Sequence, residues 1–487
     1  MIPADAYIRI LPEIVLSVFG IIVMMLDPLL ADHDNRKSLG ILAAFGFVAA
    51  LAATVYQTTL GPAIDPAGPA TWWRMVRVDN FSIFFHVVVI LVGLAVTLMS
   101  FEYLETQQIR HGEYYALMLF ATVGMGLMSS AMELVLIFVA LEISSISTYV
   151  LAGFRRRAAE STESSLKYFL LGSFATAFFL YGIAMMFGAT RSTNIVDIAA
   201  ALHTGASPLV YLAIALMVVG LGFKVAAAPF QIWTPDVYEG APAPVVAMMS
   251  TGPKAAAFAV LLRVLFGTGA PGWFWIIWVS AALSMTLGNL GALVQQNVKR
   301  MLAYSSIAHA GYLLVAFAAT RDMNLGISAA MFYAASYAAM NVGAFAIVSH
   351  FANAGEKYVL VDDYAGLGRR SPLLAAMLTL FLLSLIGIPM TGGFFAKFYV
   401  FSAALKSNLI GLTIIGVINS AVGAYYYLRL IVLMYMREER VEVAVQPVSF
   451  GLGAALALTS VATIYLGVLP GHVLNYALAS AKMLLPW

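Results

Sequence analysis

Charged residues are absent from long stretches that recur along nearly the whole chain. Such runs cover residues 38–64, 80–101, 168–190, 264–298, 323–355 and 407–428. A helix needs about 20 apolar residues to cross the hydrocarbon core of a bilayer, and each run is long enough. Hydrophobic windows place about 14 such helices, joined by short connections. The pattern therefore predicts an all-α, polytopic membrane protein.

One of these predicted helices carries two features that membrane helices usually avoid. In residues 220–245, GLGFKVAAAPFQIWTPDVYEGAPAPV, Lys224 follows the uncharged run 198–223, and Pro229 comes five residues later. Proline lacks a backbone donor and clashes with the preceding turn, so the helix is expected to break there. A charge beside a broken helix is typical of an ion site in a transporter.

A second broken helix is predicted at residues 382–401, LLSLIGIPMTGGFFAKFYVF. Gly387 and Pro389 weaken this helix, and Lys397 follows the uncharged run 371–396. The two interrupted helices are the seventh and twelfth in order, and an odd offset inverts the second copy in the membrane. We therefore predict two inverted five-helix repeats. The expected segments are an N-terminal three-helix segment, 1–113, a first repeat, 114–266, a second repeat, 267–436, and the last helix with its tail, 437–487.

The distribution of Lys and Arg among the connections predicts the orientation. Basic residues cluster in alternate connections, most densely at 155–157, 299–300 and 369–370. Cytoplasmic loops carry such an excess. We therefore expect these loops inside and both termini outside.

Composition supports a membrane location and removes several kinds of site. Hydrophobic residues make up 62% and charged residues 10% of the 487 residues, against about 45–50% and 25% in soluble domains. The net charge of +2 gives no indication of a nucleic-acid partner, and the absence of cysteine excludes disulfides and thiolate or iron–sulfur ligation. Nucleotide-binding loops, a zinc-protease HExxH and a serine elbow are also missing from the sequence.

Four charged residues lie deep within predicted spans: Glu142, Lys224, Lys254 and Lys397. Inserting each costs roughly 2.5–3.5 kcal/mol, so each needs a partner, water or a function. We interpret them as a proton path in which Glu142 pairs with Lys224 and this pairing sets the protonation of Lys224. The alternatives are a structural helix–helix salt bridge for Glu142 and a side chain that reaches the inner surface for Lys254.

Other polar residues are weaker candidates for this path. Lys167 is near the inner end of a predicted span, where surface anchoring is an equal alternative. His309, among small hydroxyl residues, can relay protons or be a satisfied core histidine. For the remainder we expect anchors at helix ends (Arg263, Arg429), an outer-surface position (Glu133), and solvated or partner-contacting loop residues (Asp236, Glu239).

The motifs GFKVAAAPFQIWTPDVYEGAPAPV, VKRMLAYSSIAHAGYLL and GIPMTGGFFAKFYVF resemble the antiporter-like subunits of proton-translocating NADH:quinone oxidoreductase, complex I. The resemblance covers nearly the whole chain and is greatest to subunit N, the bacterial counterpart of mitochondrial subunit 2. It implies 14 spans, two inverted repeats and a midplane path of charged residues. Matching motif by motif, this path falls on Glu142, Lys224, Lys254 and Lys397, with the sixth-span lysine at Lys167.

Three features favour subunit N over its sister subunits. Lys397 replaces the glutamate of subunit M, the chain ends soon after its last predicted span, unlike subunit L, and LEISSISTYVLAGF resembles the fifth span of subunit N. One departure is Gln231, where many relatives have histidine. Since glutamine does not titrate, that position is not expected to carry a proton here.

The resemblance implies a subunit that moves protons while other subunits oxidise NADH and reduce quinone. FMN, iron–sulfur clusters and quinone are expected in the whole complex, with no cofactor or metal bound by this chain. Its expected partners are the neighbouring membrane subunits and the lipid bilayer. The alternatives are a subunit of a multisubunit cation/proton antiporter or of a membrane-bound hydrogenase, and a free-standing secondary transporter.

Overall fold

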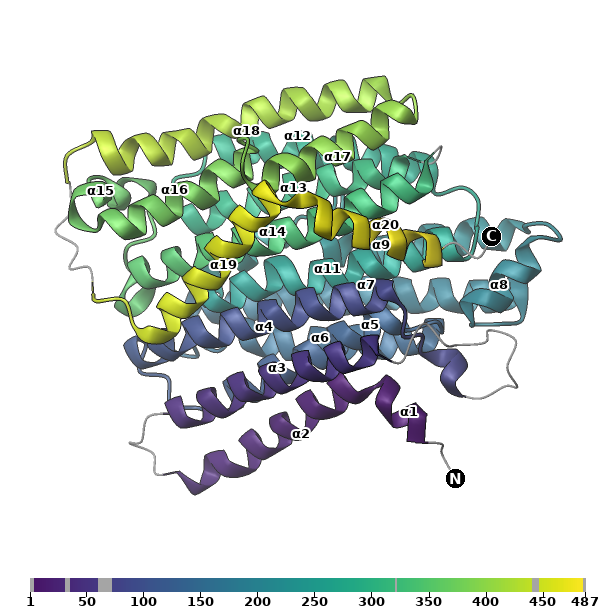
Figure 1. Ribbon diagram of the computed structural model, residues 1–487, viewed down its shortest axis with the longest axis horizontal. Helices are drawn as coiled ribbons and strands as arrows, with labels where there is room; N and C mark the ends of the chain where they lie inside the picture. The colour runs from purple at the N-terminus through teal and green to yellow at the C-terminus, as the bar shows by residue number, and fades with distance from the viewer. Residues whose placement is uncertain (1–3, 31–35, 60–71, 320–321, 440–445, 485–487) are drawn as a thin grey trace.

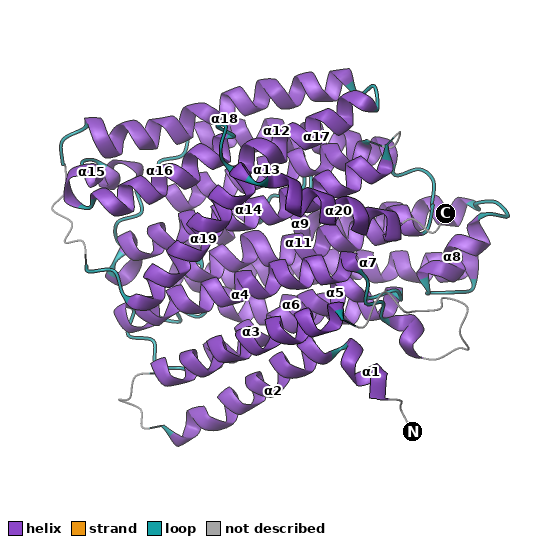
Figure 2. Ribbon diagram, viewed as in Figure 1, coloured by secondary structure: helices purple, strands orange, loops and turns teal. Residues whose placement is uncertain are grey.

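The computed structural model describes residues 4–30, 36–59, 72–319, 322–439 and 446–484, and within these ranges the chain is helical, with isolated bridges but no β-strand (Figures 1 and 2). The α-helices are α1 (Ala4–Arg9), α2 (Leu11–Leu26), α3 (Lys37–Thr58), α4 (Asn80–Thr106), α5 (Glu113–Ser130), α6 (Leu134–Ala152), α7 (Ala159–Thr190), α8 (Ile195–Leu202), α9 (Pro208–Val225), α10 (Thr234–Gly240), α11 (Ala243–Gly267), α12 (Phe274–Leu293), α13 (Val298–Ala318), α14 (Met323–Ala352), α15 (Leu367–Arg370), α16 (Pro372–Ile386), α17 (Gly392–Lys406), α18 (Ile410–Met436), α19 (Phe450–Val468) and α20 (Pro470–Leu484). Short 3₁₀ turns lie at Asp27–Leu29, Trp72–Met75, Ala354–Glu356 and Val361–Tyr364.

The long helices lie side by side in one bundle (Figure 1). Among the described residues, 12 helices are long and apolar enough to cross a membrane. This confirms the predicted all-α, polytopic architecture. The total of 14 stays a prediction, which requires α5 and the α16–α17 pair to be counted as two further spans.

Burial separates a central helix from peripheral ones. Every residue of α11 is buried, whereas only 33% of the most apolar window of α18 is buried, and 28% of that of α2. The peripheral helices expose large apolar side chains such as Phe174 and Ile418. An apolar outer surface of this kind is suited to lipid, so α11 is the helix best shielded from the bilayer.

The first predicted break lies between α9 and α10, as the sequence indicates. Ala226, in the left-handed conformation, ends α9. The freed backbone groups have partners on α12: the Ala228 amide donates to Ser284 Oγ at 2.7 Å, and Ser280 Oγ donates to the Ala228 carbonyl at 2.6 Å. Unpaired groups would be costly in hydrocarbon. The serines of α12 therefore allow a non-helical segment deep in the bundle.

The second break lies between α16 and α17. Gly387, with a φ of +95°, ends α16 in a conformation that suits glycine. At the start of α17, Gly393 approaches α16 so closely that a Cβ would lie 1.8 Å from the Ser384 carbonyl oxygen. Both predicted interruptions are confirmed, with Lys224 in the last turn before the first and Lys397 inside the helix that follows the second.

A buried carboxylate, that of Glu356, binds several of the segments that meet at one end of the bundle. Glu356 accepts from Lys299 at 2.6 Å, from Arg155 at 2.9 Å, from Tyr103 at 2.7 Å and from the Ala243 amide at 2.9 Å. Burial alone would raise the pKa of Glu356, but the two cations outweigh it and hold this pKa below its usual value. The cluster fixes the start of α11 and brings the basic loops at 155–157 and 299–300 to the same end.

Candidate functional site

Lys224 is buried between α6, α7 and α9, with 4% of its surface exposed. Its Nζ donates to Ser145 Oγ at 2.9 Å and to Tyr168 OH at 3.3 Å. The same nitrogen lies 5.8 Å from the centre of the Tyr149 ring. Tyr168 stacks on Trp233, the last residue of the break before α10, at 4.5 Å. Neutral hydroxyls and aromatic rings therefore hold this ammonium group.

Glu142 does not form the direct ion pair with Lys224 that the sequence interpretation invoked. Its side chain is half-buried on α6, one turn before Ser145, and its Oε1 is buried without a hydrogen-bond partner. No salt bridge within 4.0 Å joins the two described side chains. Two of the three ammonium hydrogens of Lys224 are instead directed at Ser145 and Tyr168. A proton role for Glu142 stays a prediction.

Lys254 lies on the wholly buried helix α11, directly after Pro253. Its Nζ donates to Ser306 Oγ at 2.6 Å and to the Ser306 carbonyl at 3.2 Å, both on α13. A small cavity beside it is also lined by His309, with about 10 Å³ available to the centre of a water molecule. This is near the lower limit for one water. Lys254 does not reach the surface, which argues against the surface alternative.

His309 connects α13 to two neighbouring helices through hydroxyl groups. Its Nδ1 contacts Tyr333 OH on α14 at 2.6 Å, and its Nε2 contacts Tyr427 OH on α18 at 3.3 Å. Tyr427 also hydrogen-bonds Ser305 Oγ. Each of these groups can both donate and accept. The geometry permits the relay reading of His309, which stays a prediction.

The polar chain continues from the adjacent Tyr426 to Lys397. Tyr426 OH donates to Asn289 Oδ1 at 3.1 Å, and Asn289 Nδ2 donates to Tyr312 OH at 3.1 Å. The Lys397 Nζ lies 4.9 Å from the centre of the Tyr312 ring. A row of polar groups on α11, α13, α18 and α12 therefore leads from Lys254 toward α17.

Lys397 binds a backbone carbonyl group that the second break leaves free. Its Nζ donates to the Ile386 carbonyl, freed at the end of α16, at 2.7 Å, and to Ser420 Oγ on α18 at 2.8 Å. It is 8% exposed. No described carboxylate lies within 4.0 Å of the Nζ atoms of Lys224, Lys254 or Lys397. Each of these three buried lysines therefore donates to neutral groups only.

Lys167 lies apart from the three buried lysines. Its side chain is 40% exposed, and its Nζ pairs with Glu163 at 2.7 Å and Asp236 at 2.8 Å. Asp236 and Glu239 also bind Arg300, at 2.8 and 2.7 Å. The expectation of solvated or partner-contacting acids was therefore incomplete, because this chain supplies their cations. The surface-anchor reading describes Lys167, and a proton role for it stays a prediction.

Among the other charged residues, Arg263 differs in its surroundings from what the sequence suggested. Arg263 is not a surface anchor: it is 1% exposed and pairs with Asp79 at 2.9 Å. Glu133 caps α6 by accepting from the Leu136 amide at 2.8 Å. Arg429 on α18 donates to Gln296 Oε1 at 2.8 Å, and its role as an anchor stays a prediction. Gln231 lies in the first break, between α9 and α10.

The sequence interpretation missed the neutral members of the site. They are Ser145, Tyr168, Asn289, Ser306, Tyr312, Ser420, Tyr426 and Tyr427. Hydroxyl and amide groups are common in membrane helices, where they also serve packing. A signal existed only where such groups flank a titratable residue, as they flank His309 in AYSSIAHAGYLL. Their role depends on which helices meet, which one sequence does not reveal.

The sequence matches known proteins along its whole length. The family described as NADH:quinone oxidoreductase/Mrp antiporter, TM, matches residues 131–423. NADH-quinone oxidoreductase subunit N 2 of Koribacter versatilis is 68% identical, over 99% of this chain and 98% of the relative. NADH-quinone oxidoreductase subunit N of Trichlorobacter lovleyi is 44% identical, over 98% and 97%.

Solved structures share the fold. A chain of respiratory complex I from Thermus thermophilus is 36% identical, with a TM-score of 0.81, over 95% of this chain and 98% of that chain. A chain of the Mrp complex from Dietzia, at 21% identity, has a TM-score of 0.85 over 97% and 98%, which shows the fold alone. The chain therefore belongs to the NADH:quinone oxidoreductase/Mrp antiporter family, among the subunit N proteins of NADH-quinone oxidoreductase.

Proposed function

We propose that this chain is a proton-translocating membrane subunit of NADH:quinone oxidoreductase, and that its buried lysines carry the proton. One observation supports this most strongly: Lys224, Lys254 and Lys397 are buried, and each is held by neutral groups. A buried charge without a counter-charge is expensive to maintain. A lysine that gains and loses its proton during a cycle explains why such residues are kept.

Each residue has a distinct task in this proposal. Lys224 takes up a proton beside the first break, and the half-buried Glu142, one turn before Ser145 on α6, biases its protonation. Lys254 holds the proton at the centre of the bundle. Ser306, His309 and the Tyr427–Tyr426 pair then relay it toward Lys397. Lys397 releases it beside the second break. Lys167 lies at the surface end of this path, in contact with Asp236.

The two inverted repeats, 114–266 and 267–436, belong to the same proposal. Equivalent bridges support it: Glu133, before α6, pairs with Asn194 after α7, and Asn297, before α13, pairs with Leu360 after α14. The 1–113 segment and the 437–487 segment would flank the repeats. An inverted pair places one break toward each side of the membrane, so that water can reach Lys224 and Lys397 from opposite sides.

The proposed orientation puts both termini on the periplasmic side of a bacterial inner membrane. Helix α1 and the end of α20 lie at the same end of the bundle, and α15 lies at the opposite end (Figure 1). FMN, iron–sulfur clusters and quinone are assigned to other subunits of the complex. The sequence has no cysteine to ligate a cluster.

Co-purification together with transport tests this function. We expect a tagged chain, extracted in mild detergent, to bring down flavin and iron–sulfur subunits together with other membrane subunits. NADH should then drive proton uptake into vesicles that contain the complex. Recovery without redox subunits, with sodium-dependent proton exchange that needs no NADH, would contradict the proposal and support the antiporter alternative.

A further inference from the structure

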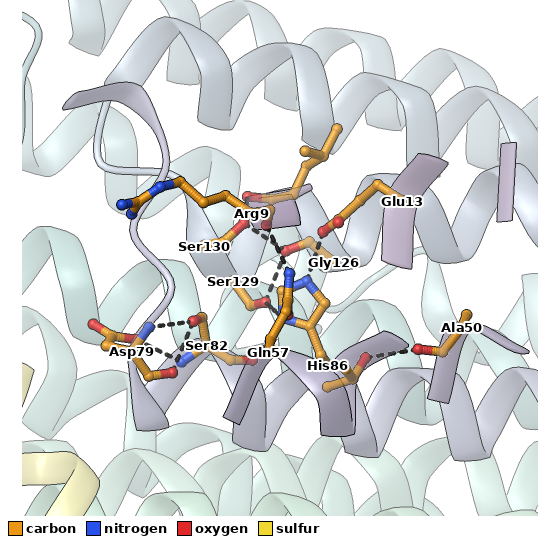
Figure 3. A network of polar contacts seen from close by, with 12 residues as sticks. Arg9, Glu13, Ala50, Gln57, Asp79, Ser82, His86, Gly126, Ser129 and Ser130 are labelled. Carbon is orange, nitrogen blue, oxygen red and sulfur yellow. Dashed lines mark hydrogen bonds and ion pairs between the residues drawn. The ribbon is translucent and has the colours of Figure 1, made fainter. Parts of the chain in front are cut away.

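A buried acid–histidine pair lies outside the lysine path, in the N-terminal three-helix segment. Glu13 on α2 and His86 on α4 are 5% and 4% exposed. Glu13 Oε1 lies 2.6 Å from His86 Nε2, and the second carboxylate oxygen, Oε2, is buried without a hydrogen-bond partner (Figure 3). Neither residue was singled out by the sequence interpretation.

The surroundings of His86 determine how many protons the pair holds. Its Nδ1 lies 2.7 Å from the Ser82 carbonyl, which can only accept, so Nδ1 carries a hydrogen. The contact between Nε2 and Glu13 Oε1 then also needs a hydrogen between the two atoms, on the ring or on the carboxyl group. In either arrangement the pair is neutral overall and holds one exchangeable proton. Losing it leaves one buried negative charge.

A cation lies close enough to stabilise that negative charge. Ser129 on α5 contacts His86 Nδ1 through its Oγ at 3.3 Å, and its carbonyl accepts from Arg263 Nε at 2.9 Å. Arg263 belongs to α11, the helix that carries Lys254. Two other charged groups near the pair are Asp79, bound to Arg263 at 2.9 Å, and Arg77, at 3.4 Å from Asp79.

Helix α5 makes room for the Glu13–His86 pair with a glycine, Gly126. A Cβ on Gly126 of α5 would lie 2.9 Å from Glu13 Oε1 and 3.2 Å from His86 Nε2. Gln57 of α3 closes the site by donating to the Ile8 and Arg9 carbonyls at 3.0 and 2.8 Å. From α20, Tyr476 stacks on Phe84 of α4 but contributes no charge. The pair is thus enclosed by α2, α3, α4 and α5.

From this geometry we infer that Glu13 and His86 form a second proton-binding site, close to the end of the bundle where α1 lies. Arg263 and Ser129 join this site to α11. The inference rests on the proposed function, because the proton that the site binds is the one that the lysine path transports. Glu13 and His86 would then hold that proton between α11 and the membrane surface.

Nearly isosteric variants test this inference in the whole complex. Glu13→Gln and His86→Gln retain a polar side chain at each position but cannot share the proton. The number of protons pumped per NADH oxidised is measured in vesicles, because this ratio does not depend on how much complex assembles. Asp27→Asn is the matched control: Asp27 follows α2 and binds Arg36 at 2.6 Å, away from the histidine.

We expect both Gln variants to lower the ratio by the same factor as Lys254→Ala, while Asp27→Asn retains the wild-type ratio. A wild-type ratio in both Gln variants, across the pH range in which the complex works, would overturn the inference and leave the pair as an anchor for α2. If Lys254→Ala also retained the wild-type ratio, the proposed function would fail as well. The two failures are therefore distinguishable.

Discussion

Replacing Lys224 by alanine or arginine separates a proton carrier from a structural cation. In the structure its ammonium group has two hydroxyl partners, at 2.9 and 3.3 Å, and no described carboxylate within 4.0 Å. Arginine can replace the charge and the hydrogen bonds but does not readily lose its proton. Alanine removes both the charge and the titratable group.

The energies of the alanine variant nearly cancel. Removing three methylenes of the buried stem costs about 2.4 kcal/mol, at about 0.8 kcal/mol for each. Removing the charge from the membrane interior returns roughly 2.5–3.5 kcal/mol. The net change is about 1 kcal/mol or less, so Lys224→Ala should assemble at close to the wild-type level.

Proton pumping, in contrast, should be weakened in both variants. The assay is NADH-driven proton uptake in membrane vesicles, normalised to assembled complex, with Lys406→Ala as a control at an exposed lysine at the end of α17. We expect weakened pumping in Lys224→Ala and Lys224→Arg and normal pumping in the control. Full pumping by the arginine variant together with poor assembly of the alanine variant would refute the reasoning and leave Lys224 a structural residue.

Three further predictions concern the fold and its orientation. The pKa of Glu356 is lowered in the folded state, so the ionised carboxylate stabilises the fold above its usual pKa near 4.5, and this stabilisation is lost as pH falls through the pKa of the folded state. Glu356→Gln should therefore remove this acid sensitivity in thermal unfolding and destabilise the chain by roughly 3–5 kcal/mol at neutral pH. Unchanged stability would count against the cluster. Gly393→Ala should destabilise the fold by about 1–3 kcal/mol, and so lower the amount of assembled complex, because the added Cβ would clash with the Ser384 carbonyl. Gly411→Ala, whose added Cβ would have no atom within 4 Å, should assemble normally. Equal assembly of the two variants would disprove close packing at the second break. A single cysteine from Arg156→Cys, introduced into this cysteine-free chain, should react with an impermeant reagent only from the cytoplasmic side, and labelling of intact cells would reverse the orientation.

The sequence predicted the features that follow from local chemistry. Uncharged runs gave the membrane helices, and Pro229 and Gly387 indicated the two interruptions, because each residue changes what its own backbone can do. The three lysines stood out because a charge within an apolar run is rare. These signals are contained in short segments and need no knowledge of the packing.

Partners across helices were beyond the sequence. Lys224 was expected to pair with Glu142, yet Ser145 and Tyr168 take that place. Arg263 was taken for an anchor because its position near a helix end resembles that of a surface residue, and only the packing of α11 against Asp79 shows it to be buried. Glu13 and His86 lie 73 positions apart in sequence, so their contact has no local signal.

The central claim is that the buried lysines act in series on one proton path. The most direct test measures protons pumped per NADH oxidised for Lys254→Ala, Lys397→Ala and the double variant. If both lysines lie on one path, either substitution alone already stops transport along it, and the second adds nothing. All three variants should therefore show the same reduced ratio. A wild-type ratio in either single variant, or a double variant whose loss equals the sum of the two single losses, would contradict the account.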